Sequence, residues 1–248
     1  MSNTLEVISP NWPAPSKIKA FSTYRQGGVS DKPFDGLNLA QHVNDESQSV
    51  AANRQLLEQR LEHPQAPHWL TQTHSTTVVQ YQDSNINCEA DGVFSRQAGQ
   101  ACVVMTADCL PVLLCSKQAD FVAAVHAGWR GMAEGILLNA LKLFQEPRQL
   151  MAWIGPAISQ QHFEVGAEVK ALFGQANQDF AAFFEASNHD RFLADLPAIA
   201  QLQLEQQGVE VYQSGLCTYA NPKQFFSYRR DGETGRMASM IWIEDEHG

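Results

Sequence analysis

The sequence predicts an α+β fold whose sheet-rich centre is covered by helices. Three short apolar runs follow one another at residues 101–105, 112–115 and 121–126, as expected for buried strands. Directly after them the apolar residues adopt helical spacing, and strand-like and helix-like segments mix without the regular alternation of a doubly wound sheet. A chain of 248 residues is compatible with one large domain, which we expect to span residues 1–248.

The first part of the chain is predicted to contribute one strand and one helix before the central region. The apolar pattern at residues 18–23 predicts the strand, and the composition of residues 47–61 predicts the helix. Two more strands are expected at residues 69–73 and 76–81, on either side of His74.

A helix is predicted after the central strands, where apolar residues recur at helical spacing until Pro147 stops it. These apolar residues are Met132, Ile136, Leu137, Ala140, Leu141 and Phe144. A later helix is expected at residues 195–207, with Asp195 as the N-cap and Gly208 as the stop.

The remaining elements alternate irregularly towards the C-terminus. Strands are predicted at residues 150–154, 209–213 and 237–243, and a further helix at residues 166–173. This mixture of both element types supports the α+β expectation over an all-helical or all-β fold.

The charge balance limits the classes of partner. The chain has 27 acidic and 17 basic residues, a formal net charge of −10 and a pI near 5.2. Nucleic acids and anionic membranes attract proteins that carry an excess of Lys and Arg, so neither is expected as a partner. No segment approaches the roughly 20 apolar residues that span a bilayer, and the first residues lack the pattern of a signal peptide.

The five cysteines are an odd number and include no C-x-x-C pair. That pattern fits reduced thiols better than a secreted disulfide framework, so the expected compartment is the cytoplasm. Cys102 and Cys115 lie inside apolar runs, where a thiol is expected to pack as a small hydrophobic group.

Two histidines and one cysteine stand where apolar segments break into turns, namely His74, Cys109 and His126. Thiolate and imidazole are preferred zinc ligands, and catalytic zinc sites often use three protein ligands with one open position. The separations of 35 and 17 residues match no compact zinc-finger spacing. The same residues also fit a metal-free cysteine enzyme with Cys109 as nucleophile and His126 as base, so both chemistries stay open.

Several arginines are candidates for binding an anion. Arg130 lies in a glycine-flanked turn between the strand of His126 and the next helix, where backbone N–H groups are free. Arg229 and Arg230 follow aromatic residues, and Arg25 precedes two glycines. Each arginine is equally compatible with a tight turn or a solvated surface.

Taken together, these segments resemble the YfiH family, also called DUF152 or the laccase-domain family. The resemblance is carried by eight blocks in order along nearly the whole chain. They are the blocks at residues 25–30, 36–40, 71–74, 90–92, 106–111, 125–131, 154–159 and 226–230.

The resemblance implies a layered α/β/β/α fold, distantly like the cysteine deamidase toxins, and a zinc trio formed by His74, Cys109 and His126. It implies phosphorolysis of adenosine, inosine and guanosine, with adenosine deamination and methylthioadenosine phosphorolysis as further activities. Asp108 is then expected to join the trio in catalysis. Asp108 or Asp91 could orient a ligand or move a proton, and a turn-stabilising role is the alternative for either residue. Substrate and phosphate are expected to contact residues within the matching blocks, namely Arg25, Asn38, Gln72, Asp91, Arg130, Arg229 and Arg230.

Two other activities are carried as alternatives. A cysteine hydrolase or amidase using Cys109 and His126 would suit the editing of peptidoglycan precursors, which is also linked to the family. A copper-dependent polyphenol oxidase ranks lower, because the eight histidines include no His-x-His pair, although a Cys-His site can bind copper. The expected partners are purine nucleosides and phosphate, with a peptidoglycan precursor as the alternative, and the expected assembly is a monomer or homodimer.

Overall fold

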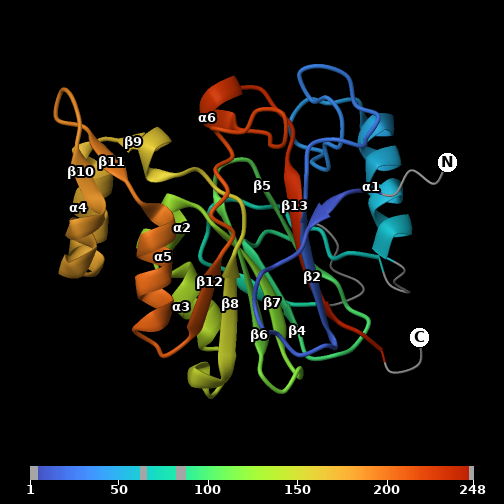
Figure 1. Cartoon of the computed structure of the whole chain (residues 1–248), viewed down its shortest axis with the longest axis horizontal. Helices are drawn as coiled ribbons and strands as arrows, with labels where there is room; N and C mark the ends of the chain where they lie inside the picture. Colours follow the sequence, from blue (N-terminus) through green and yellow to red (C-terminus); the bar gives the residue numbers. More distant parts are fainter. Residues whose placement is uncertain (1–4, 62–65, 82–87, 246–248) are drawn as a thin grey trace.

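The computed structural model describes residues 5–61, 66–81 and 88–245, and it places two β-sheets face to face between helices (Figure 1). The larger sheet has six strands in the order β12-β8-β6-β7-β4-β3. These strands are Glu210–Gln213, Leu150–Ile154, Leu110–Ser116, Val122–Ala127, Gly92–Ser95 and Val78–Gln80. The central pairs are antiparallel, whereas the two edge pairs are parallel, so the sheet is mixed.

The smaller facing sheet has four strands in the order β1-β2-β13-β5, and all of its pairs are antiparallel. Its strands are Val7–Ile8, Ile18–Thr23, Met237–Ile243 and Cys102–Thr106. A third sheet, β10-β11-β9, joins Phe184–Ala186, Phe192–Ala194 and Glu164–Val165. Strands β2, β8 and β13 have the predicted bounds.

Helices cover the outer face of each large sheet, which confirms the expected α/β/β/α layering (Figure 1). Helices α3 (Ile136–Leu141) and α5 (Leu196–Glu205) pack on the six-stranded sheet. Helix α1 (Ser47–Leu61) contributes Leu57 to a core on the outer side of the four-stranded sheet. The other helices are α2 (Trp129–Ala133), α4 (Ala167–Ala176), α6 (Tyr228–Asp231) and the 3₁₀ turns Pro147–Gln149, Gln160–His162 and Gln178–Phe183.

The strands of the larger sheet are apolar on both faces because both faces are covered. In β6, Val112 and Leu114 pack towards the helices, while Leu113 and Cys115 pack between the two sheets. Cys115 and Cys102 are fully buried there, which confirms their expected packing role. Burial raises the pKa of the Cys115 thiol to about 12, so this group stays protonated.

Two sequence-based predictions are wrong. Residues 69–73 form only an isolated bridge at Thr71. The backbone N–H and C=O of Met105 bond the Gln72 side chain, where a neighbouring strand would offer backbone groups. His74 therefore lies in a loop ahead of β3. The predicted long helix is two short helices, because Gly135 between them has a left-handed φ of 96°.

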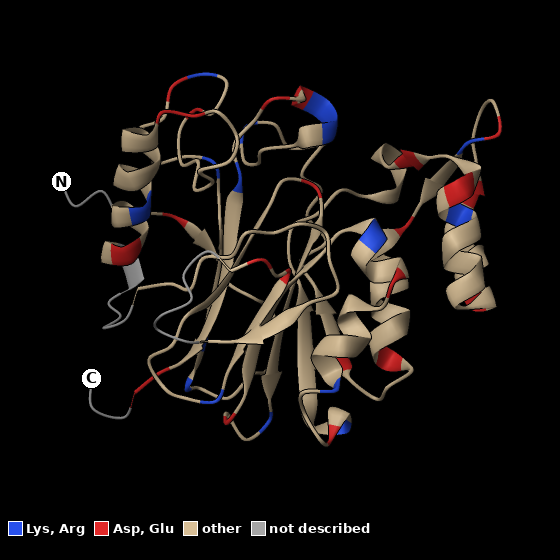
Figure 2. Ribbon diagram, turned by 180° about the vertical axis from the view of Figure 1, so that it is seen from behind, with Lys and Arg blue, Asp and Glu red and all other residues tan. Residues whose placement is uncertain are grey.

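The later helix starts as predicted. The Asp195 carboxylate accepts the backbone N–H of Ala198, and Gly208 follows the helix with a φ of 82°. In the part of the chain that the structure describes, no helix has the length and apolar character needed to cross a membrane. Lys and Arg are interspersed with Asp and Glu over the ribbon, and α6 carries adjacent basic residues (Figure 2).

Candidate metal centre

Three side chains from distant parts of the sequence meet at one end of the six-stranded sheet. His74, Cys109 and His126 each place one ligand atom within 4.8 Å of the other two. Across residues 5–61, 66–81 and 88–245, this is the one cluster of three or more His, Cys, Asp or Glu side chains close enough to share a metal ion. The structure thus brings together the three residues that the sequence singled out.

The β6–β7 pairing brings Cys109 and His126 together. Cys109 immediately precedes β6, and His126 is the penultimate residue of β7. These strands are antiparallel with Pro111 opposite His126, so the start of one strand meets the end of the other. Both residues are thus held by a fully buried sheet rather than by flexible loops.

Asp108 fixes the turn that presents Cys109. It is buried and has a φ of 95°, and its two carboxylate oxygens accept the Thr218 hydroxyl and the backbone N–H of Arg229, both at 2.6 Å. Its carboxylate therefore links the turn before Cys109 to the C-terminal segment that contains Thr218 and Arg229. These contacts hold the turn, and the expected catalytic role of Asp108 stays a prediction.

Asp91 holds the loop that presents His74. Its carboxylate accepts the backbone N–H groups of Thr73, His74 and Ser75 and the Ser75 hydroxyl, at 2.6–3.2 Å. His74 consequently stands in a left-handed conformation with a φ of 60°. Burial opposes ionisation of Asp91, but hydrogen bonding and charge from His126, with the Ser75 bonds, lower its pKa to about 2.

The same carboxylate orients His126. The Nδ1 atom of His126 lies 2.7 Å from Asp91, which leaves Nε2 to face the cluster. The two imidazole rings meet edge to face with centroids 4.8 Å apart, and His74 Nε2 lies 3.9 Å from the Cys109 sulfur. The sequence suggested Asp91 as a substrate contact or as a group that orients a ligand, and the structure places its carboxylate against His126 and the backbone of His74. Its expected substrate contact stays a prediction.

Gly128 leaves room for the cluster. A Cβ atom at this position would lie 2.8 Å from Cδ2 of His74 and 3.3 Å from the Cys109 sulfur. The glycine is therefore required by the close approach of backbone to side chains, not by a positive φ, since its φ is −72°.

The cluster favours an ionised thiol. Burial would raise the pKa of Cys109, but the charge of His126 and hydrogen bonds from both histidines lower it to about 6. Burial would likewise lower the pKa of His126, but the Cys109 charge and the Asp91 contact raise it to about 9. Thiolate is the form that binds metal or attacks an electrophile.

This donor set fits a metal ion. Two imidazoles and one thiolate are soft and borderline ligands of the kind that zinc and copper prefer, and three ligands leave a position open. The carboxylate behind His126 supplies the second-sphere hydrogen bond that metal-binding histidines usually make.

Two predicted anion-binding arginines are occupied by internal partners. Arg25 pairs with Asp35 and donates to the Pro222 carbonyl. Arg230 pairs with Asp231 and donates to the backbone carbonyls of Thr218, Tyr219 and Phe225. Both guanidinium groups hold the C-terminal loops together.

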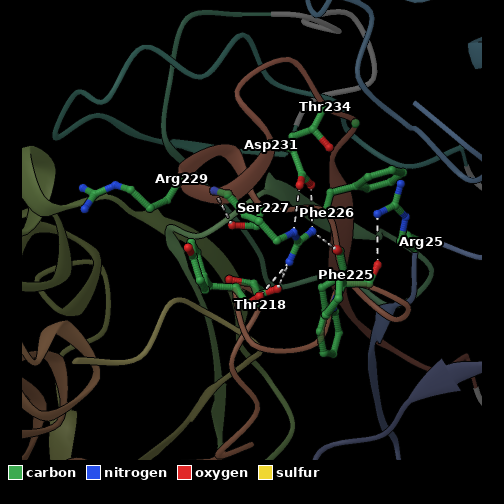
Figure 3. A network of polar contacts seen from close by, with 12 residues as sticks. Arg25, Thr218, Phe225, Phe226, Ser227, Arg229, Asp231 and Thr234 are labelled. Carbon is green, nitrogen blue, oxygen red and sulfur yellow. Dashed lines mark hydrogen bonds and ion pairs between the residues drawn. The ribbon is translucent and has the colours of Figure 1, made fainter. Parts of the chain in front are cut away.

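Two other predicted arginines are more exposed. The Arg229 side chain extends away from this network, stacks on Phe163 and donates to the Glu164 carbonyl (Figure 3). Arg130 is exposed and lies over the Trp129 ring. Their expected phosphate contacts stay predictions.

The two predicted amide contacts are engaged with the backbone. Asn38 is fully buried and donates to the Ala40 carbonyl and the Asp45 carboxylate, while its oxygen accepts the N–H of Ala40 and Arg236. Gln72 is occupied by Met105, as described above. Their expected substrate contacts are untested.

Sequence reasoning missed two basic groups beside the cluster, Arg236 and His42. The charges of Cys109 and Asp108 act on Arg236, and those of Arg236 and His126 act on His42. Neither residue stands in a motif of recognisable chemistry. The one signal for Arg236 was its place directly before the last predicted strand. The sequence does not show that this strand pairs with β5, beside the turn of Cys109.

The chain is similar to one protein family, to several named bacterial proteins and to solved structures. The family described as multi-copper polyphenol oxidoreductase laccase matches residues 19–244. The chain is 45% identical over 244 residues to a Haemophilus influenzae protein named purine nucleoside phosphorylase, covering 97% of this chain and all of that protein. It is 42% identical to the Escherichia coli purine nucleoside phosphorylase YfiH, covering 96% and 99% of the two chains. A crystal structure of a Neisseria meningitidis DUF152 protein superposes with a TM-score of 0.93 at 43% identity, covering 96% and 99%.

Proposed function

The chain belongs to the laccase-like family also known as YfiH or DUF152, and from this membership we propose that it is an enzyme that catalyses phosphorolysis of purine nucleosides. In this reaction an oxygen of hydrogen phosphate bonds to C1′ of the ribose while the C1′–N bond breaks. The purine leaves with the bonding electrons and takes up the proton, and ribose 1-phosphate is the second product. Relatives that bear the name purine nucleoside phosphorylase over almost their full length support the proposal.

One structural observation carries the proposal, the convergence of His74, Cys109 and His126 at the sheet end. These residues would hold a zinc ion, which when bound supplies Lewis acidity towards an oxygen of substrate or water near neutral pH. The chain's own contribution is positioning, because both Cys109 and His126 are fixed by β6 and β7. Asp91 keeps Nδ1 of His126 occupied, so the ring can turn only Nε2 towards a ligand.

Finer activities follow from the same site. We propose that adenosine is also deaminated and that methylthioadenosine also undergoes phosphorolysis. Asp108 and Asp91 are the proposed carboxylates for orienting a ligand or moving a proton in these steps. Hydrogen bonds from Thr218, Arg229, Ser75 and His126 hold their oxygens in place. The proposed compartment is the cytoplasm, and the proposed assembly is a monomer or homodimer.

A cysteine hydrolase acting on a peptidoglycan precursor is the second candidate, and a specific observation favours it. The low pKa of Cys109, beside His126 and with Asp91 behind that ring, is the arrangement of a nucleophile, a base and an orienting carboxylate. A copper-dependent oxidase stays the lower-ranked proposal, because the cluster offers three ligands to a single ion.

The experiment that separates these functions uses inosine and phosphate as substrates and measures hypoxanthine, ribose 1-phosphate and bound metal together. We expect His126→Ala and Cys109→Ser to lose both phosphorolysis and stoichiometric zinc. The matched control is Cys217→Ser, because the Cys217 sulfur contacts Ser159 and takes no part in the trio. Absence of ribose 1-phosphate with the unmodified protein would rule out the phosphorylase, and equal yields from His126→Ala and the unmodified protein would rule out the trio as its site. A Cys109→Ser protein that keeps zinc and loses only covalent labelling would favour the hydrolase.

A further inference from the structure

Arg236 is a half-buried cation with no carboxylate partner in the described part of the chain. The register of β13 with β5 pairs Met237 with Thr106. Arg236 therefore stands beside the residues that lead from β5 into the turn of Asp108 and Cys109. Its place next to the trio is fixed by sheet pairing rather than by a loose loop.

The local contacts hold this guanidinium group but leave much of it free. Nη1 donates to the carbonyls of Thr234 and Gly235 at 2.8 and 3.0 Å, and the group lies 5.8 Å from the Tyr228 ring centroid. Nε and Nη2 donate no hydrogen bond to any of the described residues. Arg25 and Arg230 differ, since each of them uses all three guanidinium nitrogens to bond an aspartate and backbone carbonyls.

The negative groups nearest to Arg236 are already committed. Burial lowers the pKa of Arg236, and the charges of Cys109, Asp108 and Tyr228 act against this effect. The Asp108 carboxylate is held by Thr218 and by the backbone of Arg229. Asp108 therefore acts on Arg236 as a nearby charge and forms no ion pair with it among the described residues.

A second basic group approaches from another segment. The Asn38 oxygen accepts the backbone N–H of Arg236, and Asn44 contacts Glu233, so residues 38–44 lie along the turn that carries Arg236. His42 belongs to this segment. Burial and the positive charges of Arg236, Arg54 and His126 all lower the pKa of His42. The His42 side chain is exposed on this segment, and an imidazole can offer an N–H donor to a ligand there.

The same turn contains an orphaned donor. The Thr234 hydroxyl is buried and has no hydrogen-bond partner among the described residues, although the Thr234 carbonyl holds Arg236. Unpaired buried hydroxyl groups are costly, and a ligand oxygen is one way to satisfy them. The free guanidinium edge of Arg236 and the unpaired Thr234 hydroxyl are thus two unsatisfied polar groups in one turn.

We propose that Arg236, assisted by His42, binds the phosphate co-substrate beside the metal trio. A guanidinium edge matches two oxygens of a phosphate and stays charged at neutral pH. The identity of the anion rests on the proposed phosphorylase function, whereas the binding of an oxyanion rests on the geometry. Arg236 is thereby assigned the phosphate contact for which the sequence offered four other candidates, Arg25, Arg130, Arg229 and Arg230.

The test measures phosphate recognition in two ways on the metal-loaded protein. Calorimetry gives the affinity for inorganic phosphate without nucleoside, and steady-state kinetics give separate KM values for phosphate and inosine. We expect Arg236→Gln to weaken phosphate binding and raise the phosphate KM by about 10- to 100-fold, as for loss of a charged hydrogen-bond pair. The inosine KM should change far less, and Arg236→Lys should recover part of the loss. His42→Gln should give a smaller effect of the same kind.

The matched control is Arg96→Gln. Arg96 also stacks on an aromatic ring, Phe121, and donates to the Leu143 carbonyl, but it follows the far end of β4 from the trio. If Arg236→Gln unfolds, Arg236→Lys and His42→Gln carry the test. Unchanged phosphate affinity and phosphate KM in these variants would overturn the inference while leaving phosphorolysis intact. Phosphate binding that depends on Arg236 in a protein without phosphorolysis would instead retain the anion site and remove the proposed reaction. Absence of both phosphate binding and phosphorolysis in the unmodified protein would overturn both.

Discussion

One oxygen of Asp91 lies 2.7 Å from Nδ1 of His126 and also accepts the backbone N–H of His74 at 3.0 Å. A single buried atom therefore orients two members of the trio, one through its ring and the other through its loop. The other Asp91 oxygen accepts hydrogen bonds from Thr73 and Ser75, so both oxygens of the carboxylate are fully used as acceptors.

We predict that Asp91→Asn lowers metal affinity by about 10- to 100-fold, the range for loss of an orienting group behind a ligand. An amide keeps one acceptor oxygen, so it cannot serve both the His126 ring and the three backbone N–H groups. Competition with a chromophoric chelator measures the change. Asp120→Asn is the control, because Asp120 bonds Ser116 in a turn outside the trio and should leave metal affinity unchanged. Equal affinities in both variants would contradict the orienting role.

The reactivity of Cys109 should persist to low pH in metal-free protein. The thiolate is the reactive form, and a pKa lowered to about 6 keeps it populated until the pH falls through about 6. Iodoacetamide labelling followed by mass spectrometry gives the midpoint of the profile. His126→Ala should move the midpoint upwards towards the ordinary thiol value of 9.0, since His126 supplies the largest lowering effect. An identical midpoint in the variant would exclude this cause.

Gly128→Ala should disrupt the trio although its φ suits any residue. The added Cβ would approach the His74 ring to 2.8 Å, so the ring or the turn must move. We expect loss of bound metal and about 1–3 kcal/mol of destabilisation, as for other overpacked sites. Denaturant unfolding and metal analysis report the two effects. Gly174→Ala is the control, since nothing lies within 4 Å of its Cβ, and it should be neutral or stabilising in helix α4.

Arg230→Lys should lower stability rather than phosphate affinity. A lysine cannot reproduce the guanidinium contacts with Asp231 and the carbonyls of Thr218, Tyr219 and Phe225. Loss of several of these bonds should cost about 2–4 kcal/mol, at roughly 1 kcal/mol each. Thermal unfolding with and without phosphate separates the two roles. A weakened phosphate affinity at unchanged stability would return Arg230 to the list of anion contacts.

The sequence was most informative where burial sets the pattern. The bounds of β2, β8 and β13 follow from their apolar pattern and those of α1 from its composition, and Asp195 caps its helix as its residue type predicts. Prediction failed where a side chain or a backbone angle overrides the pattern. Gln72 replaces a strand partner of Met105, and Gly135 divides one apolar stripe between two helices.

The sequence allowed the three clustered side chains to be predicted, but not the residues that surround and orient them. His74, Cys109 and His126 are chemically conspicuous residue types at the ends of apolar segments. Asp91 and Arg236 owe their positions to strand register and loop contacts, which a linear pattern does not contain. Conversely, Arg25 and Arg230 resemble anion contacts in sequence, but nearby aspartates already neutralise them.

Strand β13 lies between β2 and β5 and pairs with both, although its residues are among the last of the chain. A nascent polypeptide therefore leaves the smaller sheet split in two until residues 237–243 have emerged from the ribosome. The turn of Cys109 follows β5 directly, and its Asp108 anchor also waits for Thr218 and Arg229. We therefore expect any ion that the trio binds to be retained only once β13 has paired, and fragments that end before β13 to bind none.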